Sequence, residues 1–263
     1  MGTIAPGETH PRSVRQGDMR RDKRRRDLLE LGVGYGLILA ALWTPRPWQF
    51  ALDWAALAWV IVATVRSFDG WTAMGLRERG FLRSLWTAGV ALLLAAVAVA
   101  ISAHLHALHA PRGPLLFVSR FGLYAVWSLL QEFLLLDFFL LRLVRLLDSN
   151  TSAIFATAAL FTVAHIPNPV LMPLVIVWGL MSCAVFLRNR NLYALGLAHA
   201  ILGICVAVTV PSTADHNMRV GLGYLTYRPQ PAHQRRNKPH TVSTVACVSA
   251  EAPTLRSLRH DRP

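Results

Sequence analysis

The sequence predicts an all-α protein, a polytopic bundle of about seven or eight transmembrane helices. One observation is composition: the chain of 263 residues is 54% hydrophobic and only 16% charged, with a mean hydropathy of +0.39. This apolar share exceeds that of an ordinary soluble domain. The other is that the apolar residues gather in runs close to the ~20 residues that a helix needs to cross a bilayer.

The charge is strongly unbalanced, with 27 Lys and Arg against 14 Asp and Glu. Such a basic chain could bind nucleic acid. However, the basic residues stand at the ends of the apolar runs, where they orient a membrane protein. We therefore expect the lipid bilayer as a partner, and no nucleic acid.

The chain divides into three parts. Residues 1–27 are polar, and Arg20–Arg26 is nearly all Arg and Lys, so we expect a disordered cytoplasmic arm at the surface of anionic lipid. Residues 28–210 form the predicted transmembrane domain, and residues 211–263 form a basic polar tail that we expect to be disordered. The predicted spans are Leu28–Trp43, Phe50–Val65, Leu85–His104, Leu115–Leu136, Ser152–Ile166, Val170–Leu187 and Leu192–Val210.

The basic residues of the short loops predict how the protein is oriented in the membrane. Several arginines follow the second, fourth and sixth spans, whereas the opposite loops carry few. This pattern places the N-terminus in the cytoplasm, in a protein of the inner or plasma membrane. With seven spans, the basic tail would lie on the side of the membrane opposite the N-terminus. The sequence therefore leaves open whether there is an eighth span.

Three ionisable residues, Glu132, His165 and His199, lie inside apolar runs. Each costs at least a few kcal/mol there, which favours a functional role. At the rise of an α-helix they lie about 15, 20 and 14 Å from the cytoplasmic ends of their spans. Neighbouring antiparallel spans can therefore bring them into one polar pocket. A single histidine can equally well bond a neighbouring helix, and Asp53 near a span start is more typical of an interfacial group.

These residues belong to three short motifs: Gln131–Leu136 (QEFLLL), Phe161–His165 (FTVAH) and His199–Gly203 (HAILG). Their order resembles the CPBP family of intramembrane endopeptidases, which includes CAAX proteases and bacteriocin-processing enzymes and is also called the Abi family. The second motif is intact. The family has Glu, Arg and Asn or Asp where this chain has Gln131, Leu136 and Gly203.

The resemblance implies that Glu132 is the base that activates water, that His165 is its partner, and that His199 holds the water or the oxyanion. Gln131, Phe161 and Gly203 would be supporting residues. No cofactor is expected. The same glutamate and two histidines could instead hold Zn²⁺ with an open position for water. The sequence has no His-Glu-x-x-His signature, and both mechanisms stay open.

We therefore expect an intramembrane endopeptidase that acts on membrane-anchored proteins or peptides. The substitutions in the first and third motifs keep a second hypothesis open, an inactive relative that serves as a membrane scaffold or a bacteriocin-immunity-type protein. A third hypothesis is a small transporter with Asp53, Glu132 and His165 as a proton relay. The sequence shows no internal repeat in its favour.

Overall fold

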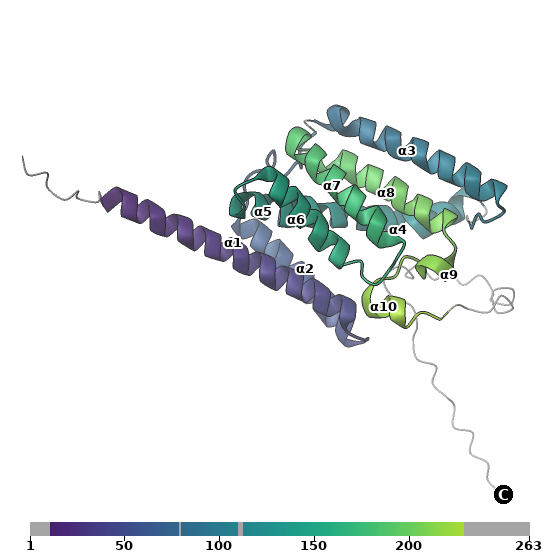
Figure 1. Ribbon diagram of the computed structural model, residues 1–263, viewed down its shortest axis with the longest axis horizontal. Helices are drawn as coiled ribbons and strands as arrows, with labels where there is room; N and C mark the ends of the chain where they lie inside the picture. Colours follow the sequence, from purple (N-terminus) through teal and green to yellow (C-terminus); the bar gives the residue numbers. More distant parts are fainter. Residues whose placement is uncertain (1–10, 79, 110–112, 229–263) are drawn as a thin grey trace, which may run out of the picture.

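The computed structural model describes residues 11–78, 80–109 and 113–228. Within these ranges every regular element is a helix, and Figure 1 shows the long helices side by side in one bundle. The predicted all-α polytopic bundle is confirmed. The elements are α1 (Pro11–Trp43), α2 (Trp48–Arg66), α3 (Phe81–His104), α4 (Pro114–Glu132), the π-helix η1 (Phe133–Leu140), α5 (Leu141–Leu146), α6 (Asn150–Val163), α7 (Leu171–Asn189), α8 (Leu192–Thr209), α9 (Ser212–Asp215) and α10 (Gly221–Leu225).

Five helical segments within the described part are long and apolar enough to cross a membrane: α2, α3, the continuous segment Pro114–Leu146 formed by α4, η1 and α5, α7, and α8. Helix α6 is apolar but shorter. The apolar run Leu28–Trp43 forms the second half of α1. The seven predicted spans thus fall in helical segments, and the protein is an integral membrane protein.

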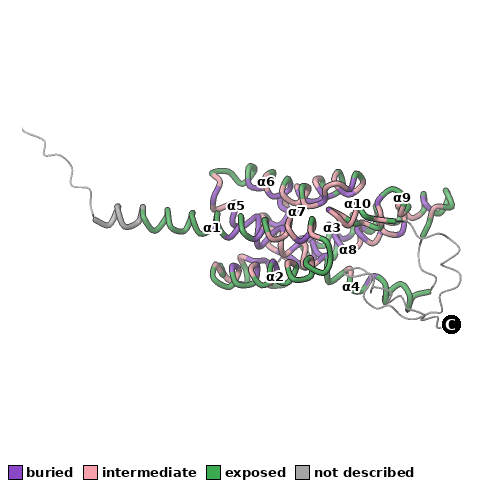
Figure 2. The backbone as a smooth tube through the Cα atoms, turned by 90° about the horizontal axis from the view of Figure 1, so that it is seen from below, coloured by how far each residue is buried: buried purple, intermediate pink, exposed green. Residues whose placement is uncertain are grey.

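Residues 1–27 were expected to be disordered, whereas the structure has a helix, α1, from Pro11 onward. Helix α1 has 33 residues, or about 50 Å, and Figure 2 shows its first part extending beyond the bundle as an exposed helix. The physical reason is that Arg, Lys, Met and Leu are good helix formers, and Arg26 lies 3.8 Å from Glu30 one turn on. Residues 1–10 lie outside the described part.

The helical part of the chain continues past residue 210, the expected end of the transmembrane domain, because α9 and α10 follow it. The Asn168 side-chain amide donates hydrogen bonds to the Asp215 and Arg219 carbonyls, at 2.8 and 2.9 Å. Gly221, at a φ of 56°, lies against the Leu42 carbonyl near the end of α1. These contacts fix α9 and α10 at the end of the bundle opposite the basic arm (Figure 1). The rest of the predicted tail, residues 229–263, lies outside the described part.

Helix α8 packs between α3 and α4, and many of its side chains are buried. Two of its glycines let α4 approach closely. A Cβ on Gly196 would lie 2.6 Å from the Leu129 side chain, and a Cβ on Gly203 would collide with the hydroxyl and ring of Tyr124. Small residues at such crossings allow membrane helices to pack by van der Waals contact.

We predict that Gly203→Ala lowers the thermal stability of the purified protein, because the added methyl group displaces the Tyr124 phenol. Adding Tyr124→Leu should recover part of the loss. Gly122→Ala on α4 is the matched control, since its Cβ meets nothing within 4 Å, and it should be neutral or stabilising. Equal effects at positions 122 and 203 would contradict this packing.

Two ion pairs, one buried and one partly buried, join α1 to α5. Arg142, 1% exposed, donates from Nε and Nη2 to Glu30 Oε2 at 3.0 and 2.9 Å. Arg145 donates to both carboxylate oxygens of Asp27 at 3.0 Å. Arg142 also donates to the Ser67 hydroxyl at 2.7 Å, so the end of α2 is tied to the same group.

We predict that Glu30→Gln destabilises the protein by about 3–5 kcal/mol, because removing one partner leaves the buried Arg142 charge uncompensated. Denaturant titration in detergent measures this. The control is Glu78→Gln, which changes an exposed carboxylate. The double change Glu30→Leu with Arg142→Leu should cost less than Glu30→Gln alone, and a larger cost would refute the assignment.

Candidate active site

The carboxyl group of Glu132 is the centre of the candidate site. Glu132 is the last residue of α4 and its side chain is fully buried. Three donors from two other helices reach it. Trp178 Nε1 donates to Oε1 at 2.5 Å, the Ser182 hydroxyl donates to Oε2 at 2.6 Å, and His199 Nδ1 lies 2.8 Å from Oε1. The carboxyl therefore joins α4 to α7 and α8.

The two donors on α7 follow from helix geometry. Trp178 and Ser182 stand four residues apart, so they share one face of α7 and reach the two oxygens of the same carboxyl. Neither was identified from the sequence. The signal available was a Trp and a Ser at this spacing within an apolar run, which is too common in membrane helices to indicate a partner by itself.

His199 lies on the face of α8 that meets α4 and is 8% exposed. Because Glu132 Oε1 accepts from Nδ1, the other ring nitrogen, Nε2, is left for other contacts. The indole of Trp178 packs beside the imidazole at a ring distance of 5.6 Å. The ring of His199 is thus oriented both by a carboxyl and by an aromatic wall.

His165 lies in the turn that follows α6 and is also 8% exposed. Its Nδ1 lies 2.7 Å from the Phe161 carbonyl oxygen, which can only accept, so Nδ1 carries the proton. The ring of Phe161 contacts both imidazoles, at 4.7 Å from His165 and 6.3 Å from His199. Phe161 therefore links the two histidines.

The residues of the three sequence motifs thus meet, but in a different pairing from the one expected. Glu132 bonds His199, whereas His165 bonds the backbone of its own helix turn. Of the supporting residues, Phe161 lies between the histidines and Gly203 faces Tyr124, while Gln131 is half-buried. Asp53 is exposed on α2, and the hydrogen bonds described for Glu132 involve α7 and α8.

The zinc alternative considered above would use Glu132, His165 and His199 as ligands. Among residues 11–78, 80–109 and 113–228, no three His, Cys, Asp or Glu side chains are placed to hold one metal ion. A four-coordinate zinc site needs such ligands to point at one centre.

A second carboxyl, Asp137, is buried five residues after Glu132. It lies in η1, is 3% exposed, and neither of its carboxyl oxygens has a hydrogen-bond partner among the described residues. A buried polar group without a partner reduces stability by about 1–3 kcal/mol. The two carboxyls therefore have opposite environments, one fully satisfied and one not.

We predict that the same substitution has opposite effects at these two positions. Asp137→Leu should raise the melting temperature, because it removes the unsatisfied group. Glu132→Leu should lower it, because Trp178, Ser182 and His199 lose their acceptor. Loss of stability in Asp137→Leu comparable to that in Glu132→Leu would show that Asp137 has a partner of its own.

Comparison with known proteins supports the family resemblance of the region that contains this site. Residues 115–205 match the family described as Type II CAAX prenyl endopeptidase Rce1-like. They contain all three motifs, so the resemblance of this region to the CAAX protease family is confirmed. Neither the curated proteins nor the solved structures include a match to the chain.

Proposed function

We propose that this protein is an intramembrane endopeptidase that hydrolyses peptide bonds of membrane-anchored protein or peptide substrates. One observation carries the proposal: a buried glutamate holds Nδ1 of a histidine at 2.8 Å, next to a second histidine fixed in one tautomer. A carboxylate that orients an imidazole leaves Nε2 as a proton acceptor, which is the arrangement that general-base hydrolysis requires.

In this proposal, His199 rather than Glu132 is the base. Glu132 accepts from three donors, and one of them is Nδ1 of His199, so the carboxyl is placed to orient the imidazole. Its role is then to hold His199 in the Nδ1–H tautomer and to stabilise the imidazolium. His199 Nε2 takes a proton from water as the oxygen attacks the substrate carbonyl, and returns it to the leaving amine.

His165 has a complementary role. With its Nδ1–H donated to the Phe161 carbonyl, its Nε2 is left to hold the attacking water or, when protonated, to donate to the oxyanion. Phe161 keeps both imidazoles at fixed separation from its ring. The scheme uses this chain's side chains and water, with no cofactor.

The arrangement of charges also supports one orientation of the protein in the membrane. Arg142 and Arg145 lie at the same end of the bundle as the basic first half of α1, to which they are bonded through Glu30 and Asp27. Positive charge gathered at one end is typical of the cytoplasmic side. We therefore place the N-terminus in the cytoplasm of an inner or plasma membrane.

A specific observation favours a second candidate, an inactive relative that acts as a membrane scaffold or immunity-type protein. Leu136 stands where the family has Arg, and it is fully buried in the apolar core. Tyr124 fills the space that a side chain at Gly203 would need. Two positions that carry polar groups in the family are thus built into the packing of this chain.

The test is proteolysis by the protein reconstituted in liposomes, with membrane-anchored reporter peptides, prenylated and unprenylated. We predict cleavage by the native protein and a loss of at least about 10²-fold in His199→Ala and Glu132→Gln, since each removes one partner of the base. His165→Ala should also lose activity. His104→Ala, which changes an exposed histidine at the end of α3, is the control and should retain it.

The two candidates give different results. Near-native cleavage by His199→Ala would refute the assigned base. An inert native protein, whose biological effect survives in Glu132→Gln, would establish the scaffold.

A further inference from the structure

Two loops interlock at one end of the bundle. The first joins α2 to α3, and the second is the turn from α7 to α8. The Leu192 backbone N–H donates to the Gly75 carbonyl at 3.0 Å, and the Asn191 amide donates to the Arg77 carbonyl at 3.0 Å. Gly80, at a φ of 81°, lies directly against the Asn189 carbonyl, where a side chain would not fit.

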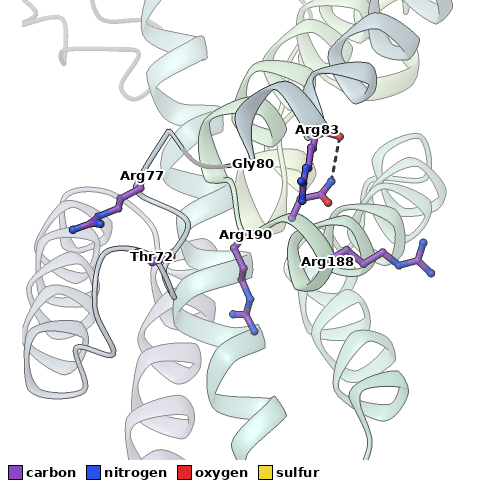
Figure 3. Close-up of a pocket in the computed structure, with 7 residues that line it drawn as sticks. Thr72, Arg77, Gly80, Arg83, Arg188 and Arg190 are labelled. Atoms are coloured by element: carbon purple, nitrogen blue, oxygen red, sulfur yellow. Dashed lines mark hydrogen bonds between the residues drawn. The ribbon is translucent and has the colours of Figure 1, made fainter.

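The two interlocked loops and the adjoining helix ends line an open pocket of about 430 Å³. Its lining includes four arginines and two small polar residues, and no acidic residue. Figure 3 shows the side chains of Arg77 and Arg188 pointing outward in opposite directions from the pocket, with Arg83 and Arg190 between them. The Asn189 side-chain amide donates to the Arg83 carbonyl at 3.3 Å. The six are Arg77, Arg83, Arg188, Arg190, Thr72 and Asn189.

No arginine of this pocket forms an ion pair within the part of the chain that the structure describes. All ion pairs found among the described residues lie elsewhere, at Arg26, Arg142, Arg145 and His199. Arg190 is half-buried above the Phe186 ring at 5.4 Å, and burial lowers its pKa, although the Asp137 carboxyl opposes the change. An anion in the pocket would compensate these charges.

The position of the pocket indicates which anion. It lies where α2 and α7 end and α3 and α8 begin, which is the level of the lipid headgroups for helices that cross the bilayer. Large apolar side chains stand next to the lining residues in sequence: Trp71 is 58% exposed and Leu82 is 81% exposed. Tryptophan at this level is typical of the membrane interface, and such side chains suit acyl chains.

We propose that this pocket binds the phosphate group of an anionic phospholipid. Guanidinium groups bind phosphate oxygens through paired hydrogen bonds, which distinguishes arginine from lysine. The lipid phosphate sits among the four arginines, and its acyl chains run along the exposed apolar residues of the loop and of α3. This site is separate from the Glu132 site and does not depend on the proposed hydrolysis.

The test is lipid binding by the purified full-length protein, measured by native mass spectrometry and by thermal shift. The probes are short-chain phosphatidylglycerol, short-chain phosphatidylcholine and inorganic phosphate. We expect phosphatidylglycerol to bind best and to raise the melting temperature most. Arg83→Gln with Arg188→Gln should weaken its binding about thirtyfold, since each basic residue near the membrane surface contributes about fivefold.

Two further variants make the result specific. Arg120→Gln with Arg219→Gln removes the same charge outside the pocket and should leave binding unchanged. Arg83→Lys with Arg188→Lys keeps the charge but loses the paired hydrogen bonds, and should be intermediate. Equal weakening in the Arg120 and Arg219 variant, or equal binding of phosphatidylcholine, would overturn the site. An equal thermal shift with inorganic phosphate alone would overturn the assignment to lipid.

Discussion

The buried carboxyl of Glu132 is the constraint on which the arrangement of the central helices depends. Inside an apolar bundle, a carboxyl must find donors within the protein, because neither water nor lipid supplies them. Its donors are Trp178, Ser182 and His199. The requirement therefore sets the rotation of α7 and α8 about their own axes relative to α4. The same contacts that satisfy Glu132 orient the imidazole of His199, so stability and the proposed chemistry rest on one set of hydrogen bonds.

A second polar anchor lies on the same continuous segment, Pro114–Leu146. Arg142 and Arg145 hold the carboxylates of Glu30 and Asp27, which fixes α1 against α5. Between the two anchors the segment is π-helical over Phe133–Leu140. A π-turn changes the direction in which later side chains point, because each turn holds an extra residue. The segment thus presents Glu132 to α7 and α8, and Arg142 to α1.

The departures from the family pattern have physical consequences in this chain. Gly203 permits the close approach of Tyr124, and Leu136 completes the apolar core. Placing a larger polar side chain at either position would therefore require the neighbouring packing to change. The proposed peptidase has to work with Glu132, His199 and His165, and the ring of Phe161 lies beside both imidazoles. The scaffold alternative rests on the same two substitutions.

The sequence by itself determined the fold class, the positions of the seven apolar runs and the identity of Glu132, His165 and His199 as residues that need a reason to be buried. These are local properties, since hydropathy and the cost of a buried charge follow from residue type alone. Net charge led to the expectation of a disordered arm, whereas the structure has a helix from Pro11 onward, which helix propensity and the pairing of Asp27 with Arg145 favour.

Only the tertiary structure decided the partners. It bonded Glu132 to His199 instead of His165 and added Trp178 and Ser182. It also left Asp137 without a hydrogen bond among the described residues, and brought four arginines from two distant segments of the chain to the lining of one pocket. The physical reason is that a hydrogen bond between helices depends on their rotation and axial offset. Those quantities are set by the packing of all the helices together, including the π-helical segment and the glycine crossings, and no single motif contains them.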